Sequence, residues 1–173
     1  MHLEPVHIEP VHVELVPALP AHQPILSNLL QFYLYDFSQF IPIEPGPDGR
    51  FEYPQLPLYW SDPGRFPFLA VVDGKWAGFV FIKQLPDSGG DGCDMAEFFV
   101  PRSYRRRGIG LRLAHLAFER FPGAWQVRVM ESNSAACQFW QQAIESFTGA
   151  SMLPTRTRVD GTAWYVFRFE SRA

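Results

Sequence analysis

One segment of the chain, residues 95–110, combines residue types that favour anion binding. An apolar strand leads into a basic turn and then into two glycines that open a helix: Val100, Arg105, Arg106, Arg107, Gly108 and Gly110. The first N–H groups of a helix have no partner within it, and the helix dipole is positive at that end. Glycine also lets a bulky group approach the main chain without interference from a Cβ atom. The segment therefore predicts a phosphate site at a helix start.

The spacing of this loop carries a family resemblance. Arg105-x-x-Gly108-x-Gly110 resembles the Arg/Gln-x-x-Gly-x-Gly/Ala pyrophosphate loop of the GNAT superfamily, which comprises acetyl-CoA-dependent N-acetyltransferases. A second block, residues 133–140, resembles the Asn-x-x-Ala-x-x-Phe-Tyr segment that opens the next helix in that family. The two blocks occur in the family's order, separated by one helix and one strand. The likeness is most specific over residues 93–148 and extends loosely from His12 to the C-terminus.

The resemblance implies that two central strands splay apart and that the pantetheine arm of acetyl-CoA lies between them. The arms would be residues 97–100 and 127–130. The residues carried over as cofactor-binding are Phe98, Phe99, Val100, Arg105, Arg106, Arg107, Gly108, Ile109, Gly110, Asn133, Ala136, Phe139 and Trp140. The alternative is an ordinary strand-turn-helix crossover with solvated arginines and with Asn133 as a plain helix cap. A P-loop is excluded because no Gly-Lys-Ser/Thr follows, and a dinucleotide fingerprint fails at Leu113.

Acetyl transfer to an amine benefits from a base at the acceptor and an acid at the leaving sulfur. Glu97 is the candidate base, because apolar neighbours can raise the pKa of its carboxyl group; a salt-bridged or solvent-facing glutamate is the alternative. Asp94 is a second choice. Relatives often place a tyrosine acid where Trp140 stands, and an indole N–H is no practical proton source. Three alternatives follow: the thiolate leaves unassisted, another group such as Tyr104 acts as the acid, or activity is reduced. Trp140 is equally well explained as a core residue.

The surrounding elements are predicted from periodicity and turn signals. Strands are expected at residues 12–16, 68–72, 76–84, 95–100 and 125–130, with two more between 155 and 169. Helices are expected at 25–40, with Ser27 as a cap, at 111–120, and at 134–146 with Asn133 or Ser132 as a cap. The order predicts one α/β (α+β) GNAT-like domain over residues 12–173. Its sheet is mixed, mostly antiparallel and six- or seven-stranded, with splayed central strands and about four flanking helices.

Residues 1–11 precede that domain and contain imperfect copies of a five-residue repeat with histidines beside carboxylates. An odd period turns successive histidines to opposite strand faces, which argues against shared metal ligation. We therefore expect an N-terminal extension and no metal. Between helix and strand, the proline-rich stretch 41–66 is predicted to be an ordered loop packed on the body. The run Asp36-Phe-Ser38 and the segment Tyr59-Trp60-Ser-Asp-Pro-Gly64 together resemble a subgroup of uncharacterised predicted acetyltransferases.

Composition narrows the function classes. The chain has 173 residues, 47% hydrophobic content and a net charge of −3, which suits a single globular domain and disfavours nucleic-acid or anionic-membrane binding. Two cysteines without metal or redox spacing fit a reducing compartment, so a cytoplasmic location is expected. Pairing of the C-terminal strands across a homodimer is compatible with the pattern but not required by it.

Two functions remain open. One is an N-acetyltransferase that transfers the acetyl group of acetyl-CoA to a primary amine of a small molecule or peptide, by direct attack in a ternary complex. Its acceptor pocket would be lined by the proline-rich loop, with Asp36, Asp62 or Glu52 available to attract a cation. The other is an acyl-CoA-binding module with little turnover, which Trp140 favours.

Overall fold

The computed structural model describes residues 11–85 and 92–172. Within these ranges seven strands form one sheet in the order β1-β2-β3-β4-β5-β7-β6. Only β4 and β5 run parallel; the other neighbours are antiparallel. The strands are β1 (Val13–Pro17), β2 (Arg65–Val72), β3 (Lys75–Gln84), β4 (Gly92–Phe99), β5 (Gly123–Met130), β6 (Thr155–Val159) and β7 (Thr162–Ser171). The predicted mixed, mostly antiparallel sheet is confirmed.

Four α-helices accompany the sheet in the described residues: α1 (Gln23–Phe37), α2 (Leu58–Ser61), α3 (Ile109–Arg120) and α4 (Ser134–Thr148). The first helix begins earlier than predicted, because Pro24 needs no hydrogen-bond acceptor in a first turn. Ser27 is therefore not its cap but lies within the helix, where its hydroxyl accepts from Arg50 at 3.1 Å. The predicted cap of α4 is confirmed, since the Asn133 side chain accepts from Ala136 N–H at 3.1 Å.

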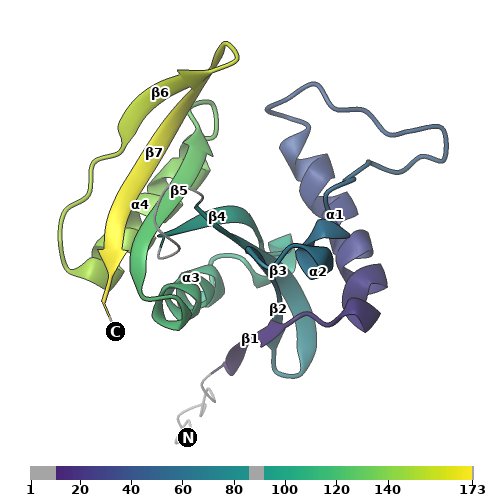
Figure 1. Ribbon diagram of the computed structural model, residues 1–173, viewed down its shortest axis with the longest axis horizontal. Coiled ribbons are helices and arrows are strands. Elements are labelled where there is room, and N and C mark those ends of the chain that lie inside the picture. The colour runs from purple at the N-terminus through teal and green to yellow at the C-terminus, as the bar shows by residue number, and fades with distance from the viewer. Residues whose placement is uncertain (1–10, 86–91, 173) are drawn as a thin grey trace, which may run out of the picture.

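The helices cover the two faces of the sheet in pairs (Figure 1). One face packs on α3 and α4, in clusters that include Phe118 and Trp140. The opposite face packs on α1, α2 and the loop between them, in a cluster built around Leu30, Phe79 and Phe81. The long stretch after α1, predicted as an irregular ordered loop, contains the short helix α2, and its Tyr59 is buried in this second cluster. Each face of β2 and β3 is thus buried, which explains their continuous apolar runs.

The sheet opens in its centre. β4 pairs with β5 only from Gly92 opposite Ala124 to Met95 opposite Val127. Beyond that point the edge of β4 that faces β5 has no strand partner, and the predicted splay is confirmed. Just there the register between β3 and β4 shifts, because Phe81 pairs with Glu97 and Ile82 with Met95, leaving Ala96 as an extra residue. Such a bulge bends a strand and re-aims its side chains.

A close backbone contact fixes the end of β4. Gly78 in β3 has a φ of 127°, and a side-chain carbon at this position would clash with the carbonyl oxygen of Phe99. Only glycine combines that backbone angle with so close an approach. The last residue of β4, from which the basic turn departs, is therefore held against β3 by main chain rather than by side chains.

At the far edge of the sheet, β6 is exposed along its whole length and pairs only with β7. The N-terminal extension predicted for residues 1–11 lies outside the described residues except for its last one. Among the described residues no cluster of three or more His, Cys, Asp or Glu side chains is arranged to bind a metal ion. None of the described helices has the length and apolar character needed to cross a membrane.

Candidate active site

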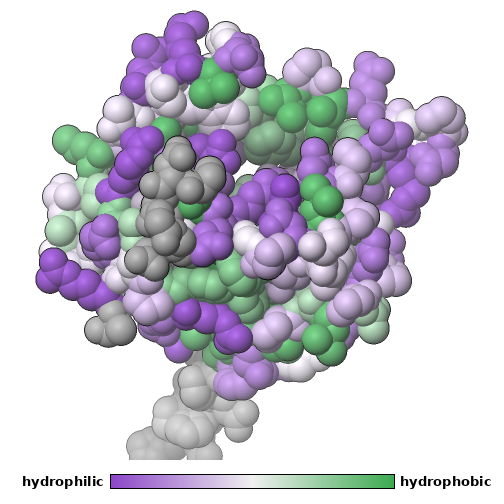
Figure 2. All heavy atoms as spheres, viewed as in Figure 1, coloured by the Kyte–Doolittle hydropathy of each residue, from purple (hydrophilic) through white to green (hydrophobic). Residues whose placement is uncertain are grey.

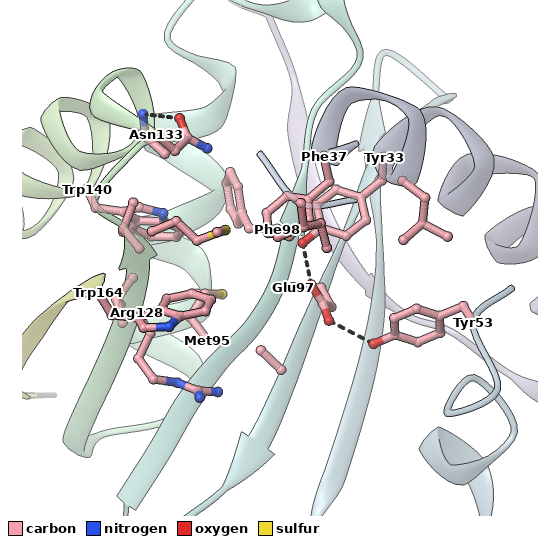
Figure 3. A pocket seen from close by; sticks show the side chains of 17 residues that line it. Tyr33, Phe37, Tyr53, Met95, Glu97, Phe98, Arg128, Asn133, Trp140 and Trp164 are labelled. Carbon is pink, nitrogen blue, oxygen red and sulfur yellow. Dashed lines mark hydrogen bonds between the residues drawn. The ribbon is translucent and has the colours of Figure 1, made fainter. Parts of the chain in front are cut away.

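A cavity of about 380 Å³ lies where β4 and β5 separate (Figure 3). Its walls come from α1, the loop before α2, both parting strands, the start of α4 and β7. The predicted residues Glu97, Phe98, Asn133, Ala136 and Trp140 line it. Seen in the orientation of Figure 1, the molecular surface is hollowed between the half that carries β5–β7 and the half that carries α1, and hydrophilic side chains gather there (Figure 2). The cavity thus lies where the resemblance predicted a cofactor.

Glu97 extends into this cavity from the bulge in β4. The extra residue places Ala96 and Glu97 on the same face of the sheet, against α1, while Met95 and Phe98 face α4. The Glu97 carboxylate accepts a hydrogen bond from the Tyr33 hydroxyl of α1 and another from the Tyr53 hydroxyl at 2.9 Å. Figure 3 shows the carboxyl group held between these two phenols. This satisfied, oriented carboxylate differs from both alternatives considered for it, a salt bridge or free solvation.

Burial raises the pKa of Glu97, and the hydrogen bonds from Tyr33 and Tyr53 act in the opposite direction. A group whose pKa is raised toward the working pH is suited to accept a proton and release it again. Burial also raises the pKa of Tyr33 and of Tyr53, so both phenols keep their protons and remain donors. The arrangement is therefore a single titrating carboxyl group held by two neutral hydroxyls.

The second candidate base, Asp94, is committed to another interaction. Its side chain is buried, with 4% exposure, and the Arg128 guanidinium donates to both of its oxygens, at 3.2 Å and 2.8 Å. Gln126 adds a third hydrogen bond at 3.3 Å. Hydrogen bonding to Asp94 raises the pKa of Arg128. Asp94 thus positions Arg128, which lines the cavity on the strand opposite Glu97 (Figure 3).

The loop after β4 has unpaired backbone N–H groups, as expected. Gly108 precedes α3 with a φ of 74°, and the first helical hydrogen bond runs from Arg112 N–H to its carbonyl at 3.0 Å. Within the described part of the chain, the amides of residues 106 to 111 have no protein acceptor. A Cβ atom on Gly110 would stand 3.2 Å from the Phe139 ring, so glycine lets the first turn of α3 pack closely against this ring. These features fit an anionic group bound by backbone N–H groups.

The arginines of this loop differ from one another. Arg106 and Arg107 are exposed, as expected for groups facing a phosphate or solvent. Arg105 instead donates to the carbonyl of Val100 at 2.7 Å and to Asp36 at 2.7 Å, and Arg102 donates to the other Asp36 oxygen at 2.8 Å. Arg105 therefore ties the turn to α1. The idea that Asp36 attracts a cationic acceptor is wrong, because two arginines already neutralise it.

The aromatic residues predicted for the cofactor site pack behind it. Phe98 contacts Trp140 edge-on with ring centroids 4.9 Å apart, and Phe139 lies 5.6 Å from Phe98. Trp140 is 6% exposed and lines the cavity, so it is both a core residue and part of the wall. Asn133 caps α4 with its oxygen, while its amide nitrogen points toward the cavity (Figure 3). Ile109 is buried under the loop, and Phe99 packs near Tyr33.

Tyr104, the substitute acid, does not line the cavity; it lies below the loop, where Arg107 stacks over its ring at 6.0 Å. Asp62 is bound by Arg65 at 3.0 Å and is not a lining residue either. Sequence reasoning missed Tyr33 and Arg128 as site residues. No local motif marks them, and only the fold brings α1 and β5 to Glu97.

The family follows from a direct match. Residues 29–144 match the model of the acetyltransferase (GNAT) family. Because this match covers most of the chain, the protein belongs to the GNAT family of acetyltransferases. It is an acyltransferase, and acetyl-CoA is its cosubstrate. No curated protein sequence matches the chain.

Solved structures share the fold over nearly the whole chain. An acetyltransferase from Thermus thermophilus is 19% identical, with a TM-score of 0.66, covering 91% of this chain and 96% of its own. The spermidine N-acetyltransferase of Vibrio cholerae, solved with CoA and spermine, is 12% identical with a TM-score of 0.65, covering 92% and 95%. NAA60 of Arabidopsis thaliana, solved with a bisubstrate analogue, is 18% identical with a TM-score of 0.58, covering 92% and 98%. At these identities the likeness concerns the fold alone.

Proposed function

We propose that the protein transfers an acetyl group to a primary amine of a small molecule or peptide, by direct attack while both substrates are bound, with Glu97 as the base. The observation that carries this proposal is the placement of Glu97. It is the titratable carboxyl group that lines the cavity between the parting strands, and its pKa is raised by burial. Among the structural relatives, one is named for an amine, spermidine, as its substrate.

The roles of the residues follow from their positions. Acetyl-CoA supplies the thioester carbonyl that the amine attacks. The unpaired amides around Gly108 and Gly110 hold the diphosphate, and the free edge of β4 after Met95 offers hydrogen bonds to the pantetheine arm. Glu97 takes the proton of the attacking amine, while Tyr33 and Tyr53 hold its carboxylate in one orientation. Phe98 and Trp140 exclude water on the other side of the strand.

Trp140 is the residue that we expect to interact with the leaving sulfur. In the described part of the chain the indole N–H has no protein acceptor, so it is available to donate a hydrogen bond at the cavity. An indole can stabilise a developing thiolate in this way without giving up its proton. The thiolate then leaves as an anion, which costs little at neutral pH because the pKa of an ordinary thiol is about 8.5.

A thiol-release assay with acetyl-CoA and a panel of primary amines tests the proposal. We expect turnover with at least one amine, and acetylated product identified by mass. The competing function, an acyl-CoA-binding module, is favoured by the tryptophan that replaces the usual tyrosine. It predicts CoA binding by calorimetry without thiol release above the hydrolytic background for any amine. Those two outcomes are mutually exclusive.

A further inference from the structure

A row of polar residues crosses the sheet beside the cavity. The strand registers place five residues directly side by side on five neighbouring strands: Arg65, Lys83, Asp94, Gln126 and Arg168. Residues paired in this way share one face of a sheet, and here it is the face of Glu97. Arg128 lies on the same face two residues further along β5. We call these six residues the cross-strand row. It contains four cations and one carboxylate.

Among residues 11–85 and 92–172, the carboxylates nearest the row are already bound by protein groups. Asp94 accepts from Arg128 and Gln126, and Asp62 accepts from Arg65. Glu97 accepts from its two tyrosines. Glu170 lies further along the same face, opposite Ala124 at the end of β7, away from the cavity. The acidic side chains that the structure describes near the cavity thus offer little to a second cation.

The cations, in contrast, retain unused donors. Lys83 forms no ion pair among the described residues, and burial lowers its pKa, a cost that a bound anion would offset. Arg128 uses two of its nitrogens on Asp94, and its third, Nη1, has no protein partner within the described ranges. Its side chain is 49% exposed and lines the cavity. Arg128 is held in place by Asp94 and yet remains free to bind a ligand.

We propose that the acetyl acceptor carries a carboxylate, which binds to Arg128 and Lys83 while its amine lies at Glu97. This inference rests on the proposed function. Asp94 and Glu97 are three residues apart on β4, and Ala96 between them lies in the bulge. At about 3.3 Å per residue, the two subsites are therefore separated by roughly 7–10 Å. The acceptor is therefore an amine with a carboxylate several bonds away, as in an ω-amino acid or a short peptide. A polyamine would place a second ammonium group beside like charges, which is unfavourable.

Matched acceptors test the proposal on the unaltered enzyme. The three acceptors each carry a terminal amine on a five-carbon chain. They differ at the other end, which is a carboxylate in aminopentanoate, a methyl group in pentylamine and a second ammonium group in diaminopentane. We expect kcat/KM for the amino acid to exceed that for the monoamine roughly tenfold, with the diamine lowest. Equal or faster turnover of the diamine overturns the inference and leaves the proposed function intact. Failure of all three acceptors while another primary amine is acetylated also overturns the inference, whereas failure of every amine in the wider panel overturns the proposed function.

Variants locate the subsite. Lys83→Gln should lower several-fold the ratio of kcat/KM for aminopentanoate to kcat/KM for pentylamine. The ratio is compared because the Lys83 charge also lowers the pKa of Glu97, which affects both acceptors alike. Turnover of pentylamine shows that the variant is folded. Removing both partners together, in Asp94→Asn with Arg128→Gln, should abolish the preference for the amino acid without leaving a buried charge unpaired. Arg158→Gln, on the opposite face of the exposed strand β6, is the control with the same change of charge. An unaltered preference in the double variant would contradict the assignment.

Discussion

The two sides of the cavity are built from different chemical groups. The cofactor side, residues 99 to 111, relies on main-chain N–H groups and glycines, and most of its side chains point to solvent or to other parts of the protein. The acceptor side relies on side chains from three separate segments, Tyr33, Tyr53 and Glu97. The first should tolerate changes of side chain but not of backbone shape. The second should tolerate no change in the polar groups themselves. Four predictions test this contrast, from the largest expected effect to the smallest.

Backbone shape is tested at Gly78. Gly78→Ala should lower the free energy of unfolding by about 4 kcal/mol or more, because the new carbon clashes with the Phe99 carbonyl at a φ that alanine avoids. Gly74→Ala is the control, since its φ is also positive but nothing lies within 4 Å; it should cost about 1 kcal/mol. Denaturant melts measure both. Equal losses would show that the contact at Phe99 is dispensable.

The base is tested by Glu97→Gln, which keeps the shape and removes the titration. We expect kcat to fall about 10²- to 10⁴-fold while CoA affinity, measured by calorimetry, stays unchanged. Glu52, considered above as a group that attracts the acceptor, is exposed and is not a lining residue of the cavity. Glu52→Gln is therefore the matched control and should retain full activity. If CoA affinity fell as much as kcat, Glu97 would belong to the cofactor side. The proposed difference between the two sides of the cavity would then be wrong.

The tyrosines are tested through the pH dependence of kcat/KM. Glu97 must be deprotonated to act, so activity rises with pH through its pKa, which burial has raised above the ordinary carboxyl value. The hydrogen bonds from Tyr33 and Tyr53 stabilise the carboxylate and lower that pKa. Tyr33→Phe and Tyr53→Phe should therefore each move the acidic limb of the profile to higher pH. Tyr35→Phe, at a position 66% exposed on the same helix, should leave the profile in place.

The smallest effects are expected at the exposed arginines of the loop. Arg106→Ala and Arg107→Ala should each weaken CoA binding by a few-fold, in line with roughly 0.3–1 kcal/mol for an exposed charge at a helix start. The effect should shrink as salt is added. A hundredfold loss from either substitution would show that side chains, rather than amides, hold the diphosphate.

The same contrast explains what the sequence could predict. The loop at Gly108 and the cap at Asn133 depend on neighbours in the chain, so their residue types reveal them. Tyr33 is separated from Glu97 by 64 residues. It lies in a helix with ordinary apolar spacing, and nothing in that pattern marks Tyr33 as a site residue. The pairing of Asp36 with Arg102 and Arg105 is equally long-range. Local motifs therefore located the cofactor loop, whereas the acceptor side required the fold.

The bulge at Ala96 could not be predicted from the sequence either, because no glycine or turn residue marks it. Bulges arise from the register that two strands adopt together, and β3 contributes to this one as much as β4 does. Alternation from Met95 would have predicted that Glu97 faces α4. The sequence could nominate the glutamate as a base from its position beside the motif, but it could not assign the helix that Glu97 faces.

The extra residue in β4 also determines what a deletion there would do. With Ala96 removed, Met95 and Glu97 would be neighbours in a regular strand, and Glu97 would still face α1 while Phe98 still faced α4. A relative that lost this single codon would keep its diphosphate loop and would keep its glutamate on the same side of the sheet. It would lose only the bend that the bulge gives β4 at the point where β4 leaves β5.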